Sequence, residues 1–172
     1  MKKITYYLVC KRTVAKRKQC EGFYNDYIFK DGKWLPDNEH IIMDHLAEYA
    51  PSEPEDSPYR IGGTGILMEM EEISGQDAVE ITNRQSISIL KDLWKKKIKK
   101  EKEEWDKGSK WPAKLVKTRF MLNGIEYTIW PSDIGLSDDP WDQGFMESIQ
   151  SEIKADLKEF GATDIFNYGF LD

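Results

Sequence analysis

The sequence contains few residues of the types that form redox or metal-binding motifs. Two cysteines, Cys10 and Cys20, occur among its 172 residues, and they are not spaced as a C-x-x-C pair. Because no second cysteine pair exists to complete a zinc site, we interpret both as reduced thiols. Reduced thiols are typical of a reducing intracellular compartment.

The two histidines give an equally weak metal signal. His40 and His45 are not separated by the interval of H-E-x-x-H, so they do not share a helical face in that way. His40, Asp44 and Glu48 would lie on one face of a helix, which we interpret as a solvated polar surface and not as a metal site. His45 is expected at the edge of the core. The sequence therefore predicts no metal and no other cofactor.

Long apolar runs are absent. No stretch approaches the roughly 18 consecutive apolar residues that cross a membrane. The apolar run near the N-terminus, Ile4 to Cys10, ends at Lys11 and Arg12, and no cleavage site of the A-x-A type follows it. We therefore expect a cytoplasmic protein that does not associate with a membrane.

Recognisable catalytic motifs are also missing. The sequence GGTG at 62–65 comes nearest to a phosphate-binding loop, but it has neither P-loop nor dinucleotide-binding spacing. Glu69, Glu71 and Glu72 follow it and no lysine occurs before Lys91, so its surroundings would repel a phosphate. We interpret it as a turn that leads into a strand or a short helix. No serine or cysteine has a recognisable catalytic partner, so the sequence favours a protein that is not an enzyme.

Aromatic and charged residues, in contrast, are abundant. Hydrophobic residues make up 40 % of the chain, aromatic residues 12 % and charged residues 33 %. This aromatic content excludes a disordered chain and indicates a folded core. The net charge of −6 is unevenly distributed, because residues 1–18 carry only basic charges whereas residues 37–80 are strongly acidic. The two segments could form separate patches or neutralise each other in the fold.

Residue patterns predict short elements in the first half of the chain. Asp31-Gly32 is typical of a tight hairpin turn, and Asp37 or Asn38 is suited to cap a helix. The expected elements are a strand over 3–10, a hairpin over 23–35, a short helix that extends to Tyr49 and an exposed loop over 50–58.

Longer elements are expected in the second half. Thr82 and Gln85 fit a capping box, Asn123-Gly124 fits a hairpin turn, and Asp139 is suited to cap a helix. The expected elements are an extended segment over 78–81, a long helix over 83–106, a hairpin over 115–130, a helix from Asp139 to Gly161 and a strand over 162–171.

Hairpins mixed with helices favour an α+β fold. We expect a single domain over residues 1–172, with a mostly antiparallel sheet built from hairpins. About three helices are expected to pack mainly on one face of that sheet. Strands and helices do not alternate strictly, so a doubly wound parallel sheet is not expected.

The functional hypothesis is a protein-interaction module of the accessory, inhibitor or immunity type, whose partner is another protein. It would bind through an acidic and aromatic surface, because tryptophan is enriched in binding hot spots. The candidate residues are Trp111, Trp141, Asp138 and Asp139.

Two alternatives remain open. The first is a nucleic-acid-binding accessory protein that uses the lysine-rich helix 91–102. Its candidate residues are Lys95, Lys96, Lys99 and Lys100. A pI of about 5.1 and the glutamates that follow these lysines argue against it. The second alternative is a carboxylate- and metal-dependent enzyme, for which Asp44 and Glu71 are candidates.

Overall fold

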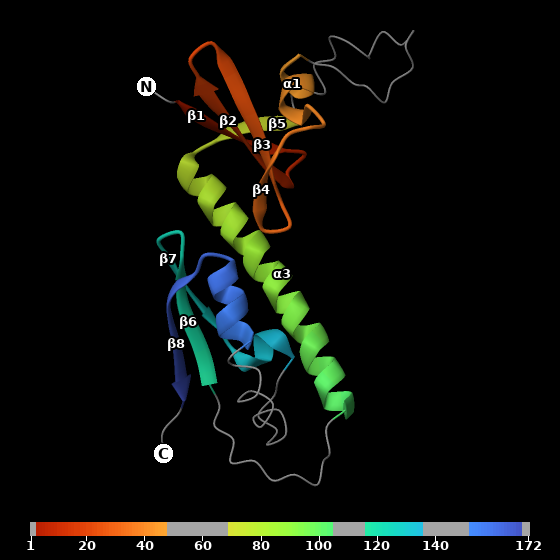
Figure 1. Ribbon diagram of the computed structural model, residues 1–172, viewed down its shortest axis with the longest axis vertical. Helices are drawn as coiled ribbons and strands as arrows, with labels where there is room; N and C mark the ends of the chain where they lie inside the picture. Colours follow the sequence, from red (N-terminus) through yellow and green to blue (C-terminus); the bar gives the residue numbers. More distant parts are fainter. Residues whose placement is uncertain (1–2, 48–68, 105–115, 136–151, 170–172) are drawn as a thin grey trace. The chain divides into compact units, whose positions relative to one another are not determined.

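The computed structural model describes residues 3–47, 69–104, 116–135 and 152–169. The chain divides into two compact units, Met1–Arg84 and Gln85–Asp172, and each is described by itself (Figure 1). The predicted α+β class is confirmed, with antiparallel sheets that contain hairpins. The strands within the described residues form two sheets, one in each unit, where one sheet was expected. That the chain acts as a single domain stays a prediction.

The first unit contains a five-stranded antiparallel sheet with the order β4-β3-β2-β1-β5. Its strands are β1 (Ile4–Val9), β2 (Thr13–Cys20), β3 (Phe23–Lys30), β4 (Lys33–Pro36) and β5 (Met70–Ile73). The predicted first strand and the hairpin at Asp31-Gly32 are confirmed. Asp31 and Gly32 have φ values of 52° and 77°, as a tight turn of the primed type requires.

The sequence pattern does not predict strand β2, because its centre is basic. The structure shows how these charges are accommodated. The ammonium group of Lys16 lies 4.0 Å from the ring centroid of Trp34, and burial lowers the pKa of Lys16. Arg17 donates to both carboxylate oxygens of Asp26, at 2.8 and 2.6 Å, and these hydrogen bonds raise the pKa of Arg17. Both compensating partners come from other strands, so they are not visible in a local pattern.

Helix α1 (Ile41–Leu46) covers one face of this sheet. His40 occupies the N-cap position, where Asp37 or Asn38 was expected, but the Asp37 carboxylate accepts hydrogen bonds from the backbone N–H groups of Ile41 (3.0 Å) and Ile42 (2.9 Å). The helix ends at Leu46, earlier than expected. The fully buried Ile42 packs with Val9 and Ala15 to form the core of this unit.

Helix α3 (Gly75–Glu104) begins in the first unit and continues through the second. The expected extended segment at 78–81 and the helix start at Thr82 are wrong, because both lie within α3. The Ser74 hydroxyl accepts a hydrogen bond from the Asp77 N–H at 3.0 Å, so the capping pattern is Ser74-x-x-Asp77. The Thr82 hydroxyl instead donates to the carbonyl of Ala78, at 2.8 Å, inside the helix.

The second unit contains a three-stranded antiparallel sheet with the order β7-β6-β8. Its elements after α3 are β6 (Val116–Leu122), β7 (Ile125–Ile129), the 3₁₀ helix η1 (Pro131–Ile134), a helix over 152–159 and β8 (Thr163–Gly169). The predicted hairpin at Asn123-Gly124, the helix end at Gly161 and the terminal strand are confirmed. Gly161 has a φ of 84°, the left-handed conformation in which helices commonly end.

The core of the second unit lies between its sheet and its helices. Trp94 of α3 is fully buried, and its indole N–H donates to the carboxylate of Asp156 at 2.9 Å. Lys97 lies 3.2 Å from both Glu152 and Asp156. Burial opposes the charge of Lys97, but these two carboxylates outweigh it and raise the pKa of Lys97. The apolar residues of this core are Ile87, Leu90, Trp94, Ile98, Phe120, Leu122, Ile129, Ile134, Ile153, Leu157 and Ala162.

Several sequence predictions lie outside the described residues. They are the loop at 50–58, the GGTG turn at 62–65 and the helix start at Asp139. Among the helices that the structure describes, none is both long and apolar enough to cross a membrane. The expected cytoplasmic location stays a prediction.

Candidate nucleic-acid interface

The sheet of the second unit has one face in the core and one outward face. Successive side chains of a strand point to opposite faces. Thr118, Phe120 and Leu122 of β6 are buried, so Lys117 and Arg119 lie on the outward face. The same alternation of apolar and basic residues is visible in the sequence of the predicted hairpin over 115–130.

Two aromatic side chains flank these cations. The ammonium group of Lys117 lies 4.9 Å from the ring centroid of Trp130, which follows β7. Arg119 is the register partner of Phe166 in β8, and its guanidinium carbon lies 5.7 Å from that ring centroid. Trp130 is 43 % exposed and Phe166 is 50 % exposed. We call Lys117, Arg119, Trp130 and Phe166 the aromatic–cationic face.

Arg119 forms an ion pair with Glu126 on this face. Arg119 Nε lies 3.5 Å from a carboxylate oxygen of Glu126, and the two side chains are 40 % and 55 % exposed. An ion pair as exposed as this contributes less than about 1 kcal/mol. Loss of the Glu126 contact would therefore add little to the cost of binding an external anion at Arg119.

The backbone of Trp130 is held by η1. The Asp133 carboxylate accepts a hydrogen bond from the Trp130 N–H at 3.0 Å, and the Asp133 N–H donates to the Trp130 carbonyl at 2.9 Å. Asp133 also lies 3.3 Å from the Lys91 ammonium group of α3. Ile134, which is 2 % exposed, anchors η1 in the core. The exposed indole therefore projects from a fixed backbone position, and binding need not order that backbone.

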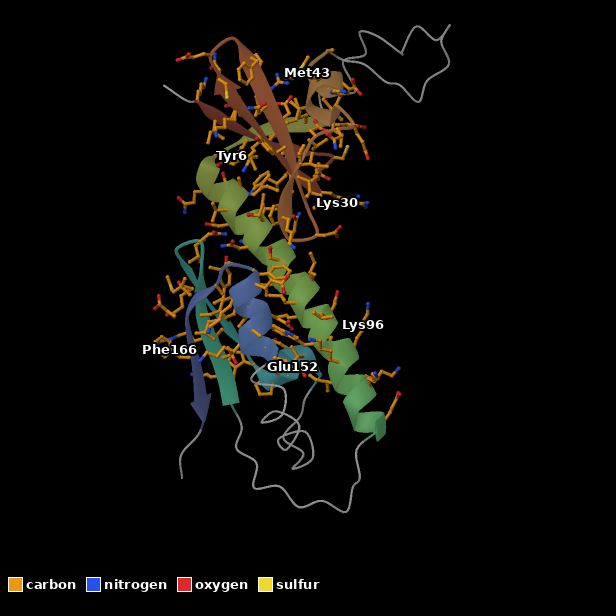
Figure 2. All side chains as sticks on the ribbon, in the orientation of Figure 1. Tyr6, Lys30, Met43, Lys96, Glu152 and Phe166 are labelled. Carbon is orange, nitrogen blue, oxygen red and sulfur yellow. The ribbon has the colours of Figure 1, made fainter. Side chains whose placement is uncertain are left out.

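All four lysines of the nucleic-acid alternative lie on α3 and are exposed. Their spacing places them along one stripe of the helix surface. Lys95 and Lys99 line an open pocket of about 400 Å³ with Ile98, Glu103, Ile134 and Gly135, whereas Lys96 and Lys100 are not part of its lining. Lys96 and Phe166 project in opposite directions from the second unit (Figure 2). The lysines and the aromatic–cationic face therefore belong to different surfaces.

The structure does not describe the residues that were predicted to bind a protein. Trp111, Trp141, Asp138 and Asp139 all lie outside the described residues. Their role in a protein-binding surface stays a prediction.

An aromatic and acidic groove occurs instead in the first unit. It has a volume of about 500 Å³ and is lined by Tyr24, Asn25, Asp26, Tyr27, Pro36, Asp37, His40 and Met43. Tyr24 is 56 % exposed and Met43 is 47 % exposed. Asp26 is paired with Arg17 and Asp37 accepts from the first N–H groups of α1, so the acidic groups of the groove already have partners. The groove therefore offers mainly apolar contact.

No protein-family model, no curated protein and no solved structure matches this chain.

Proposed function

We propose that the protein binds single-stranded nucleic acid through the aromatic–cationic face of the second unit. The observation that carries this proposal is the exposure of Trp130 and Phe166 on one sheet face, beside Lys117 and Arg119. Exposed aromatic rings offer planes on which unpaired bases can stack, and neighbouring cations can contact the phosphates between those bases. This is the chemistry of the first alternative from the sequence, on a different surface.

Single strands fit this face better than a duplex. Each base has a flat surface that can stack on Trp130 or Phe166, but in a duplex that surface already stacks on neighbouring bases. A duplex would be contacted mainly through its phosphates, for which the lysines of α3 are better suited. The proposal therefore predicts a preference for unpaired nucleic acid.

The number of phosphates that the protein neutralises sets the expected salt dependence of binding. The net charge is −6, so long-range attraction of a polyanion is not expected. If Lys117 and Arg119 each neutralise one phosphate of a single strand, raising salt from about 50 to about 200 mM should weaken binding about sevenfold. If Lys95, Lys96, Lys99 and Lys100 bound a duplex, the same change would weaken binding about 150-fold.

Fluorescence anisotropy tests the proposal. The full chain is titrated into labelled single strands of about 12 nucleotides, as DNA and as RNA, with a hairpin duplex as competitor. Trp130→Ala or Phe166→Ala should weaken binding about tenfold, since one aromatic–base stack is worth about 1–3 kcal/mol. Phe23→Ala is the matched control, because Phe23 is an exposed aromatic residue (57 %) of the first unit. The proposal would be contradicted if Phe23→Ala and Trp130→Ala lost equal affinity for the single strand. It would also be contradicted if the wild type bound the duplex more tightly than the single strand.

A second candidate function is the binding of a protein segment in the groove of the first unit. The exposed Tyr24 and Met43 favour it, because aromatic and methionine side chains are enriched in protein interfaces. Affinity capture with the tagged chain from nuclease-treated host lysate is the test. A protein that is captured by the wild type and by Phe23→Ala, but not by Tyr24→Ala, would support this function. Capture that survives Tyr24→Ala with Met43→Glu would exclude the groove.

A further inference from the structure

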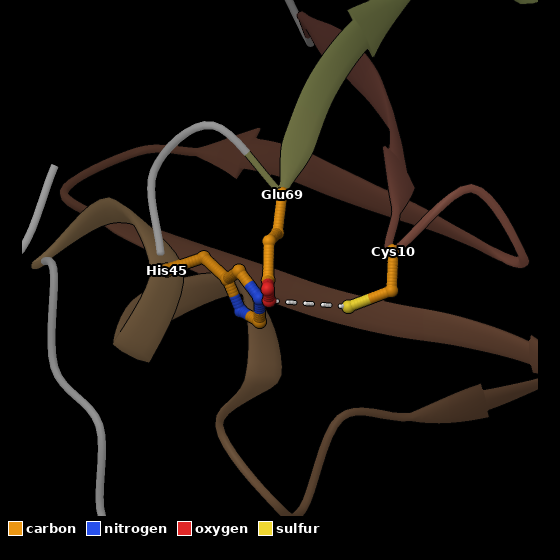
Figure 3. Close-up of side chains that lie close together, drawn as sticks. All are labelled: Cys10, His45 and Glu69. Atoms are coloured by element: carbon orange, nitrogen blue, oxygen red, sulfur yellow. Dashed lines mark hydrogen bonds between the residues drawn. The ribbon is translucent and has the colours of Figure 1, made fainter. Parts of the chain in front are cut away.

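Three potential metal ligands converge in the first unit. The sulfur of Cys10, a ring nitrogen of His45 and a carboxylate oxygen of Glu69 all lie within 4.8 Å of one another. They come from the turn after β1, from α1 and from the residue before β5, and Figure 3 shows their side chains pointing toward a common centre. In the described part of the chain this is the one group of three such donors, and neither Asp44 nor Glu71 belongs to it.

Main-chain and side-chain contacts hold Cys10 beside Glu69. The Cys10 N–H donates to the Glu69 carbonyl at 2.6 Å, which extends the β1–β5 pairing by one step. The Cys10 thiol lies 3.5 Å from a carboxylate oxygen of Glu69. Cys10 and Lys11 have φ values of 50° and 56°, a left-handed conformation that is unusual for residues other than glycine, asparagine and aspartate. This turn sets the position from which the thiol reaches Glu69.

The imidazole of His45 is oriented as a metal-binding histidine would be. Its Nδ1 lies 2.7 Å from the carbonyl oxygen of Ile41, so we assign the ring proton to Nδ1. The lone pair of Nε2 then remains for an external group. A backbone carbonyl that accepts from the second ring nitrogen is the usual way to fix the orientation of a ligating histidine.

We propose that Cys10, His45 and Glu69 form a binding site for a divalent transition-metal cation of the zinc class. Sulfur, imidazole nitrogen and carboxylate oxygen together suit zinc, whereas a thiolate disfavours magnesium and calcium. Ligands of a tetrahedral zinc ion lie about 3.5 Å apart, so the three donors need to approach by only about 1 Å. Cys10 and Glu69 are exposed, and their side chains can make this movement. The fourth coordination position of the metal ion would face solvent, so a water molecule could occupy it.

This inference is independent of nucleic-acid binding, because all of its ligands lie in the first unit. Cation binding would join the β1–β2 turn, α1 and the start of β5. The cation would therefore stabilise the first unit, since a ligand that binds only the folded state raises stability.

Titration of the metal-free, reduced full chain with cobalt(II) tests the proposal. A thiolate-to-cobalt charge-transfer band, with the d–d bands of tetrahedral cobalt, should appear and saturate at one equivalent. Zinc should displace the cobalt with a dissociation constant of about 1 μM or tighter. Absence of the charge-transfer band, or weaker zinc binding than this, would overturn the proposal.

Variants locate the site. Cys10→Ser should abolish the charge-transfer band, and Glu69→Gln should weaken zinc binding about tenfold or more and reduce the zinc-dependent rise in melting temperature. Cys20→Ser and His40→Asn are matched controls, because they change the other cysteine and the other histidine. Both controls should bind cobalt as the wild type does. A band that persists in Cys10→Ser, or that disappears in Cys20→Ser, would overturn the assignment.

Discussion

The ammonium group of Lys117 lies 4.9 Å from the centre of the Trp130 ring. The β6–β7 hairpin brings these two residues together at the end of its strands. Pairing of β8 with β6 then adds Phe166 beside Arg119. A cation over an exposed aromatic ring contributes only about 0.5–1 kcal/mol, so folding alone gives little reason for two such pairs on one open face. These four side chains are the basis of the proposal that single strands bind this face.

The first prediction concerns the support of Trp130. Asp133→Ala removes the acceptor of the Trp130 N–H and the partner of Lys91. We expect a loss of about 1–2 kcal/mol in the free energy of unfolding, measured with urea. Single-strand affinity should also fall, because the indole loses its fixed backbone. Ser132→Ala is the control within η1. Unchanged affinity in a destabilised Asp133→Ala variant would show that Trp130 does not depend on Asp133.

The second prediction concerns the core of the first unit. Ile42 is fully buried against Val9 and Ala15, so Ile42→Ala should cost about 3 kcal/mol through lost burial and the cavity left behind. Each of the two core clusters draws its residues from one unit. Hydrogen exchange followed by mass spectrometry should therefore show faster exchange in β1, β2 and α1 than in β6 and β7. A uniform increase across both sheets would mean that the units unfold together.

The third prediction concerns pH. Burial raises the pKa of the Tyr7 hydroxyl, and the charge of Arg17 opposes this shift only in part. The unfolded chain therefore loses this proton at lower pH than the folded chain does. The contribution of Tyr7 to stability is complete below pH 10 and is lost as pH rises through its folded pKa. Urea denaturation across this alkaline range should show a steeper decline for the wild type than for Tyr7→Phe. If the stabilities of the wild type and Tyr7→Phe declined in parallel with pH, the raised pKa of Tyr7 would be contradicted.

The fourth prediction compares two ion pairs of the first unit. The side chains of Arg17 and Asp26 are 12 % and 14 % exposed, whereas those of Arg84 and Glu80 are 74 % and 36 % exposed. Asp26→Asn leaves a mostly buried guanidinium group without its counter-ion and should cost about 2 kcal/mol. Arg84→Gln, the matched control, should cost less than about 0.5 kcal/mol. Similar costs for the two variants, measured by urea denaturation, would show that burial does not strengthen the Arg17 pair.

Local chemistry explains which parts of the fold could be predicted. Asp31-Gly32 and Asn123-Gly124 define their hairpins through backbone angles that few other residues adopt, and Gly161 ends a helix for the same reason. The start of α3 was misplaced because Thr82 and Gln85 imitate a capping box. The sequence offers a second pattern of this type, Ser74-x-x-Asp77, and the structure shows that this earlier one begins the helix.

The candidate sites depend on contacts that a local pattern does not contain. The alternation of Lys117 and Arg119 with buried residues was visible in the sequence, but the position of Phe166 beside Arg119 required the order of strands β6 and β8. The metal ligands are still more widely separated, since Cys10 and Glu69 are 59 residues apart. Residue spacing alone therefore did not indicate that Cys10 lies beside Glu69 and His45.

Photocrosslinking tests the central claim most directly. A single strand that carries a photoreactive thymine analogue is bound to the full chain and irradiated, and the crosslinked peptides are identified by mass spectrometry. Stacking on the aromatic–cationic face predicts crosslinks at Trp130 and Phe166 that an unlabelled single strand competes away and an unlabelled duplex does not. Crosslinks confined to Lys95–Lys100 of α3, or the absence of any competed crosslink, would contradict the proposed function.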